Sequence, residues 1–259
     1  MLRKSDFPIL EYDAVSAPIV TPDHYIEKVE NWRKITRCVI TYFSDIVELL
    51  ERAQVINQVF RLRTEGYRPR IYEMKVGNEY VFVMAAPVGA PQAARIVECL
   101  AAMGVKKFMI SGGAGTINDD VTRDYVLVPA AATRDEGTSY HYLPPSRDVQ
   151  MNPRVLSSIE KTLTAEGVKF VKIKTWTTDA IFRETIDKVE LRKAEGCSTV
   201  EMECSAFYSV AAHLGFLCGQ LLYAGDKLTK EGWDYRDWHT RGDKRTMLFD
   251  LSVKCLMNL

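Results

Sequence analysis

Short apolar runs alternate along the chain with segments whose apolar residues recur at helical spacing. Residues 39–43 predict a buried strand, and the spacing in 46–52 predicts a helix directly after it. The same signals predict strands at 80–84, 107–110, 125–129, 169–173 and 219–224, and helices at 93–103, 205–214 and from about Thr246. Strands separated by helices imply an α/β fold, with a largely parallel sheet that binds ligands at the carboxyl ends of its strands.

Composition limits the kind of protein that this sequence encodes. With 259 residues and 47% hydrophobic content, we expect one domain covering residues 1–259. Lys plus Arg and Asp plus Glu balance at 34 each, which argues against nucleic acid or an anionic membrane as a partner. The sequence has neither a signal peptide nor an apolar run near the roughly 18 residues of a membrane span, so we expect a cytoplasmic protein.

The spacing of cysteines and histidines gives no sign of a metal site or a disulfide framework. The six cysteines show no C-x-x-C spacing and several lie in apolar runs, so we expect reduced core thiols. The four histidines show neither H-x-x-x-H nor paired cysteine spacing. We therefore expect no metal and no other cofactor.

Two acidic residues, Glu201 and Glu203, flank Met202 where an apolar helix is predicted to begin. The plain interpretation is helix capping, because a helix N-terminus favours carboxylates. The functional interpretation is that a carboxylate accepts hydrogen bonds from both hydroxyls of a vicinal diol, while the methionine packs against the sugar. The motif taken alone leaves both interpretations open.

Asp226 follows the apolar run 219–224 after one glycine, at the edge where such a sheet binds ligands. An aspartate that caps a helix or lies in a loop is the plain alternative. A buried aspartic acid at this place could stay protonated and act as general acid toward a leaving base. Because a purine leaves more easily once its imidazole ring is protonated, this acid fits a purine better than a pyrimidine.

Two further segments have unusual composition. Residues 111–116 follow a strand and predict a glycine-rich turn, in which Gly112, Gly113 and Ala114 would let a ligand approach the backbone. The segment is neither G-x-G-x-x-G nor a P-loop, so it supports neither a dinucleotide nor a triphosphate ligand. Residues 230–245, with two tryptophans and alternating charges, predict an ordered loop or lid, and a subunit contact is the alternative.

Taken in order, these motifs resemble the nucleoside phosphorylase superfamily of uridine phosphorylases, hexameric purine nucleoside phosphorylases and methylthioadenosine nucleosidases. The resemblance covers about residues 36–228 and rests on V-E-M-E at 200–203, on Asp226 and on the glycine segment. A fourth element, R-D-E-G-T-S-Y-H at 134–141, resembles the R-x-D-G-x-S-x-H stretch of uridine phosphorylases with one position substituted.

The resemblance implies a fold, an assembly and a role for each matched residue. The fold would be a three-layer α/β/α sandwich around a mixed, partly barrel-like β-sheet, in homodimers or trimers of dimers. Glu203 would hold the ribose hydroxyls, Met202 would pack on the sugar, and Glu201 would assist beside it. Asp226 would be the general acid for a purine. Phe182 lies one position from the aromatic residue that the family sets against the base.

The sequence departs from the family where phosphate is bound. Phosphorolytic members place one arginine after the first strand and another before the glycine turn, and this chain has Ile46 and Ile110 there. Each lost charge-assisted contact costs about 1.5–3 kcal/mol. Nucleosidases also lack these arginines and activate water with a carboxylate, which makes Asp45 a candidate base. A substitute phosphate site is the alternative, for which the candidates are Arg61, Arg63 and Arg134.

The sequence therefore leaves three candidate functions. The leading one is a pentosyltransferase that cleaves a nucleoside, purine type favoured, through an oxocarbenium-like transition state. Its partners would be the nucleoside and phosphate, with phosphate as co-substrate. The alternatives are a nucleosidase that uses activated water and a non-catalytic nucleoside-binding protein.

Overall fold

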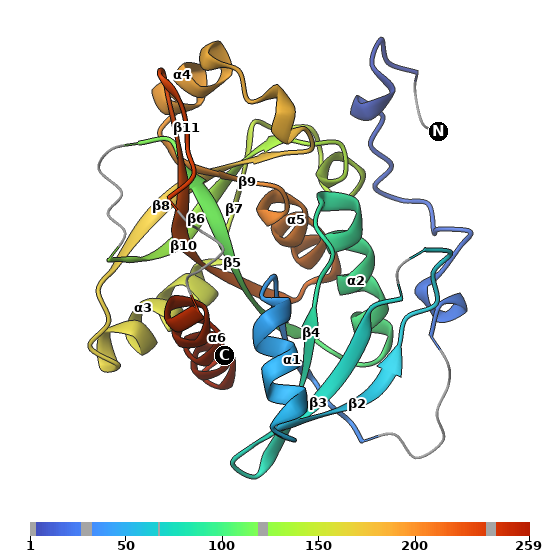
Figure 1. Ribbon diagram of the computed structural model, residues 1–259. Helices are drawn as coiled ribbons and strands as arrows, with labels where there is room; N and C mark the ends of the chain where they lie inside the picture. The colour runs from blue at the N-terminus through green and yellow to red at the C-terminus, as the bar shows by residue number, and fades with distance from the viewer. Residues whose placement is uncertain (1–3, 27–32, 67, 119–123, 237–241) are drawn as a thin grey trace.

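The computed structural model describes residues 4–26, 33–66, 68–118, 124–236 and 242–259. These residues form one eleven-stranded sheet with helices packed around it (Figure 1). The strands are β1 (Arg37–Thr41), β2 (Ile56–Arg61), β3 (Arg70–Val76), β4 (Glu79–Ala85), β5 (Lys107–Thr116), β6 (Val126–Asp135), β7 (Asp148–Gln150), β8 (Phe170–Thr178), β9 (Cys197–Glu201), β10 (Leu217–Thr229) and β11 (Gly232–Asp234). The α-helices are α1 (Ser44–Arg52), α2 (Ala90–Ala102), α3 (Pro153–Ala165), α4 (Ile186–Ala194), α5 (Cys204–Leu214) and α6 (Gly242–Met257).

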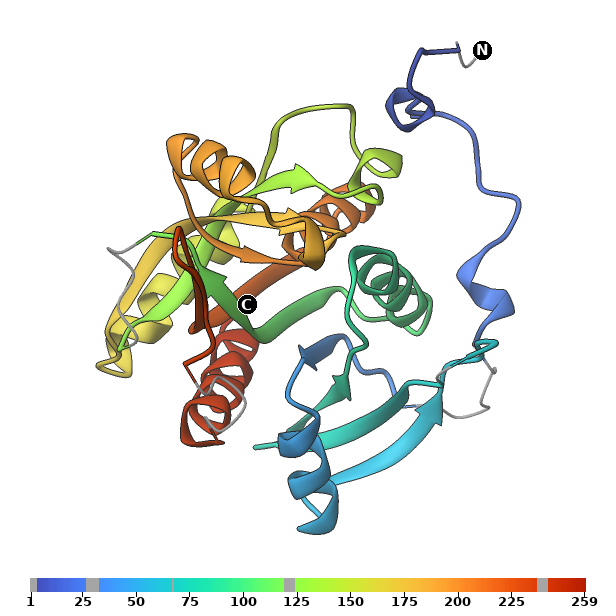
Figure 2. The ribbon, with the colours of Figure 1, turned by 45° about the horizontal axis from the view of Figure 1, so that its top comes forward.

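The sheet combines a closed barrel with an open extension. Strands β5, β10, β6, β8 and β9 are hydrogen-bonded in a ring, and β1, β4, β3 and β2 continue outward from β5. Parallel and antiparallel pairs both occur. Helices α2 and α5 pack together along one side, and α1, α3 and α6 along the other (Figures 1 and 2). The predicted three-layer α/β/α fold around a mixed, partly barrel-like sheet is confirmed.

Strand β5 changes its partner half-way along its length, and this change creates the place for a site. Residues 107–111 of β5 pair in parallel with β1, whereas Gly115 and Thr116 pair antiparallel with β9. On the other edge, β10 runs beside β5 for almost its whole length. The carboxyl ends of β1 and β9 therefore face each other across residues 112–114 of β5.

The glycine-rich segment 111–116 lies inside β5, so the predicted turn is wrong. An added Cβ on Gly112 would lie 3.3 Å from Tyr42 Cδ2, and one on Gly113 would lie 3.1 Å from the Tyr223 ring. An added Cβ on Gly115 would lie 3.0 Å from Leu228 Cδ1. The glycines therefore allow side chains from neighbouring strands to pack directly on the backbone of β5.

The predicted strands and helices are present, with some different limits and several additions. Strand β10 does not end at Asp226, because it bulges between Ala224 and Lys227 and then continues. Segment 230–245 contains β11 and the first residues of α6, while Trp238 and His239 lie outside the described residues. The hairpin β2–β3 and helices α3 and α4 were not predicted. All six cysteines are free and buried.

We expect Gly219→Ala to lower the free energy of unfolding by about 1–3 kcal/mol, because β10 and α3 are in close contact at this glycine. The new methyl group would lie 2.8 Å from both Ile159 Cδ1 and Val155 Cγ1. Denaturant unfolding followed by circular dichroism measures the change. Gly66→Ala is the control, since nothing lies within 4 Å of its added Cβ, and we expect a change within about 0.5 kcal/mol. Equal stability of the two variants would contradict this packing.

Candidate active site

Glu201 is the last residue of β9, and its buried carboxylate caps helix α5. Its Oε2 accepts the backbone N–H groups of Glu203 at 2.8 Å and Cys204 at 2.7 Å. Its Oε1 accepts the hydroxyl of Thr177 at 2.6 Å, and that hydroxyl oxygen accepts the N–H of Ser205 at 3.0 Å. The capping interpretation therefore describes Glu201, because both of its carboxylate oxygens accept hydrogen bonds from groups of the same chain.

Glu203 is the N-cap residue of α5, but its side chain does not cap the helix. Because Glu201 already satisfies the first N–H groups, the Glu203 carboxyl can turn toward α2, where Oε1 accepts the N–H of Gly89 at 2.6 Å. Burial raises the pKa of Glu203 to about 8, and the charge of Glu201 adds to the rise. Met202 lies half-buried between the two glutamates. Once ionised, the Glu203 carboxylate can accept hydrogen bonds from a diol.

Asp226 lies in the bulge of β10, on the other edge of β5. Its Oδ2 accepts the indole N–H of Trp233 at 2.6 Å, and its backbone oxygen accepts the hydroxyl of Thr116 at 3.0 Å. A Cβ added to Gly115 would lie 3.4 Å from Asp226 Oδ1 and 3.2 Å from Val200 Cγ1. The structure thus brings Asp226 and the V-E-M-E segment to the same end of β5.

Glu184, which the sequence analysis did not single out, lies in the electrostatic neighbourhood of Asp226. Burial raises the pKa of Glu184 to about 7, and the charge of Asp226 adds to the rise. Glu184 and Trp233 line a cavity of about 260 Å³ beside α4 and the β10–β11 hairpin. The available signal was its position two residues after Phe182, in the segment expected to meet the base. Glu184 therefore places a carboxyl with a raised pKa beside the predicted acid Asp226.

The two isoleucines at the family's arginine positions are both buried in the main hydrophobic core. Ile46 is 5% exposed and Ile110 is fully buried, so neither position presents charge to a ligand. Asp45, the predicted base, is exposed and forms an ion pair in which its Oδ2 accepts from Arg245 Nη1 at 3.0 Å. Arg245 of α6 lies near the end of β1, and its guanidinium is therefore already paired with the Asp45 carboxylate.

Two other predicted site residues have clear surroundings. Arg134 is buried, and its guanidinium holds one loop by donating to Ser139 Oγ, the carbonyls of Leu143 and Pro144, and Ser146 Oγ. Phe182 lies on a short 3-10 helix (Ile181–Arg183) and is 95% exposed. The roles proposed for these two residues in substrate binding stay predictions. The geometry supports a structural role for Arg134.

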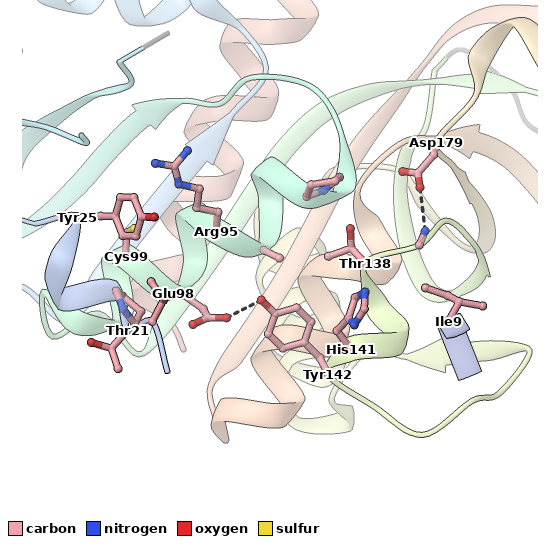
Figure 3. Close-up of a pocket in the computed structure, with 15 residues that line it drawn as sticks. Ile9, Thr21, Tyr25, Arg95, Glu98, Cys99, Thr138, His141, Tyr142 and Asp179 are labelled. Atoms are coloured by element: carbon pink, nitrogen blue, oxygen red, sulfur yellow. Dashed lines mark hydrogen bonds between the residues drawn. The ribbon is translucent and has the colours of Figure 1, made fainter. Parts of the chain in front are cut away.

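A cavity of about 640 Å³ lies apart from these residues, and none of the predicted site residues lines it (Figure 3). It is lined by the N-terminal arm (residues 4–26), by α2 and by the segment 137–142. At one end, Asp179 Oδ2 accepts the N–H of Gly137 at 2.8 Å. After burial and the charge of Glu201, the charge of Asp179 also raises the pKa of Glu203. Asp179 is therefore a lining residue of this cavity whose charge acts on Glu203.

Neither a metal site nor a membrane span is found in the described part of the chain. No group of three or more His, Cys, Asp or Glu side chains among these residues could hold a metal ion. None of their helices is long and apolar enough to cross a membrane. The groups that the site offers to a ligand are carboxyls, backbone N–H groups and aromatic side chains.

Comparison with known proteins places the chain in a family. The model of the phosphorylase superfamily matches residues 37–249, which is most of the chain. The chain therefore belongs to the phosphorylase superfamily, as the sequence motifs indicated. The relatives and solved structures that resemble the chain are named as nucleoside phosphorylases and as a nucleosidase.

Curated relatives match parts of the chain at low identity. A DeoD-type purine nucleoside phosphorylase of Aliivibrio fischeri is 27% identical over 134 residues, covering 51% of this chain and 56% of the relative. A uridine phosphorylase of Haemophilus influenzae is 23% identical over 160 residues, covering 56% of this chain and 64% of the relative. The chain thus matches less than two thirds of the length of either relative.

Solved structures share the fold over most of the chain. An AMP nucleosidase from Bacteroides thetaiotaomicron superposes with a TM-score of 0.69 at 20% identity, covering 85% of this chain and 86% of the other. A purine nucleoside phosphorylase from Toxoplasma gondii, in complex with immucillin-H, gives a TM-score of 0.70 at 17% identity, covering 87% and 90%. These similarities establish the fold.

The raised pKa of Glu203 predicts that the stability of the protein falls as pH rises. The folded chain holds this proton up to about pH 8, whereas an ordinary glutamate releases it near 4.5. Between these values the native state binds more protons than the unfolded state, so the free energy of unfolding falls by up to about 1.4 kcal/mol per pH unit. Denaturant unfolding measured from pH 5 to pH 8 should show a smaller fall in the free energy of unfolding for Glu203→Gln than for the wild-type protein. Parallel pH profiles for the two proteins would contradict a buried, protonated Glu203.

Proposed function

We propose that this enzyme cleaves the N-glycosidic bond of a purine-type nucleoside. The observation that carries the proposal is the position of Glu203 and Asp226 near the same end of β5, on opposite edges of that strand. A diol-binding carboxylate and an acid for the leaving base are the two groups that this reaction needs beside the anomeric carbon.

In the proposed reaction, the ionised Glu203 holds the ribose hydroxyls and stabilises the oxocarbenium-like transition state. The bond between C1′ and the base nitrogen breaks, and its electron pair goes to the base. Asp226 gives its proton to the imidazole nitrogen of the purine, so the base leaves neutral. An oxygen of the acceptor, phosphate or water, forms the new bond to C1′. The names of the Aliivibrio and Toxoplasma proteins, which are purine nucleoside phosphorylases, support a purine base.

Phosphate as co-substrate is the acceptor that the superfamily name suggests, and Arg245 is a cation that could hold it only in exchange for a present partner. This guanidinium lies near the end of β1, beside the ring of Phe43 at 5.6 Å from its centroid. A phosphate there would compete with Asp45 for the same cation. Water as the acceptor does not need to displace Asp45 from Arg245. Hydrolysis is the second candidate, and the name of the Bacteroides AMP nucleosidase supports it.

The proposal includes assembly into homodimers or trimers of dimers. The N-terminal arm crosses the outside of the molecule beside α2 (Figure 2) and exposes large apolar side chains, with Val15 92% and Ile19 98% exposed. Apolar side chains gathered on one exposed segment favour contact with another protein surface. Sedimentation velocity tests the assembly directly.

The function is tested by incubating the protein with a panel of purine and pyrimidine nucleosides, with and without phosphate, and measuring free base. We expect release of purine bases. Asp226→Asn should lower kcat by about 10²–10⁴-fold with little change in KM, because the proton donor is lost while the binding groups remain. Asp243→Asn, at an exposed position in the first turn of α6, is the control. Binding of nucleosides without release of any base would reject the enzyme reading and leave a nucleoside-binding protein.

A further inference from the structure

Tyr42 lies at the point where the carboxyl ends of β1 and β9 face each other. It is the first residue after β1, and its N–H donates to the carbonyl of Ser111 in β5 at 2.9 Å. Its ring covers the next residue of β5, because an added Cβ on Gly112 would lie 3.3 Å from Tyr42 Cδ2. Gly112 thus permits the ring of Tyr42 to lie against the backbone of β5.

The hydroxyl of Tyr42 is buried and has no hydrogen-bond partner among the residues that the structure describes. A buried hydroxyl left without a partner costs about 1–3 kcal/mol. Such a group in a folded protein calls for an explanation, and a bound water or ligand is one of the standard explanations. The position of Tyr42 beside the candidate active site favours a group that belongs to the reaction.

The electrostatic surroundings of this hydroxyl are acidic. Burial raises the pKa of Tyr42 well above its ordinary value, and the charges of Glu203, Glu201 and Cys204 add to the rise in that order. The phenol therefore keeps its proton, and it lies on the side of Glu203, which is expected to hold the sugar. The ionised form of Glu201 or Glu203 would repel a phosphate dianion at this place, whereas a neutral water would not be repelled.

The sheet places Tyr42 and Asp226 at opposite edges of β5. Asp226 belongs to β10, which pairs with one edge of β5, and Tyr42 follows β1, which pairs with the other edge. An acceptor that displaces the base directly attacks the face of the sugar opposite the leaving group. If the base lies toward Asp226, the acceptor approaches from the side of Tyr42.

We propose that Tyr42 is a further catalytic residue, whose hydroxyl holds the acceptor water against C1′ and so makes the enzyme a nucleoside hydrolase. This inference rests on the proposed cleavage of a nucleoside. The water oxygen forms the bond to C1′ and passes one proton to the carboxylate of Glu203. The bond to the base breaks, and the base carries away its electron pair and the proton from Asp226. The products are free sugar and free base.

The decisive experiment compares the wild-type protein with Tyr42→Phe on the nucleoside that releases its base fastest. We expect wild-type protein to yield free sugar at the same rate with and without phosphate. Tyr42→Phe should lower kcat by about 10- to 100-fold and change KM less than about threefold. Tyr80→Phe, a half-buried tyrosine on β4, is the control and should keep the wild-type kcat.

Partition between two acceptors separates a catalytic role of Tyr42 from a purely structural one. In mixtures of water and methanol, loss of the hydroxyl should raise the ratio of methyl glycoside to free sugar, because water loses its hydrogen-bond partner. An unchanged ratio together with an unchanged kcat would overturn the role of Tyr42. Strictly phosphate-dependent formation of sugar 1-phosphate by the wild-type protein would overturn it too and leave the proposed function intact. Absence of base release from every nucleoside would reject the proposed function itself.

Discussion

The site depends on the hydrogen bonds of one buried carboxylate, that of Glu201. It accepts two N–H groups at the start of α5 and the hydroxyl of Thr177, which in turn accepts a third N–H of the same helix. A helix start normally uses the side chain of its N-cap residue for this purpose. Since Glu201 and Thr177 do so here, the carboxyl of the N-cap residue Glu203 is free to face α2. The two glutamates of the motif thus have different roles. Glu201 caps α5, and this leaves the Glu203 carboxyl free of capping.

The path of β5 explains why these residues meet groups from distant parts of the sequence. Its first half pairs with β1 and its end pairs with β9, so the ends of those two strands are brought together over residues 112–114. The glycines of β5 let the rings of Tyr42 and Tyr223 lie directly on the backbone at this place. On the opposite edge, the bulge in β10 turns Asp226 toward the same end of the strand. A change of strand partner, glycines and a bulge therefore assemble the site together.

The fold was largely predictable from the sequence, because buried strands and amphipathic helices have distinct apolar periods and the family motifs occur in order. The split of roles between Glu201 and Glu203 was not, since both are glutamates and only the structure shows which carboxyl meets the first N–H groups of α5. The glycine segment was interpreted as a turn because glycine favours turns, whereas here it serves packing against Tyr42 and Tyr223. Glu184 could not be recognised either, because its proximity to Asp226 depends on the β10–β11 hairpin and on burial rather than on spacing.

The candidate site retains groups that cost stability, and this cost supports the functional role proposed for it. Glu201 and Glu203 are buried close enough for each charge to oppose the other, and Tyr42 buries a hydroxyl without a described partner. A sequence selected for stability alone would replace such groups by apolar side chains of similar shape, which is often neutral or stabilising. Sugar hydroxyls and an acceptor oxygen would satisfy the ionised Glu203 and the Tyr42 hydroxyl at once. The unfavourable terms of the free enzyme would thereby become favourable contacts with the reacting groups, which is the condition for catalysis by a preorganised site.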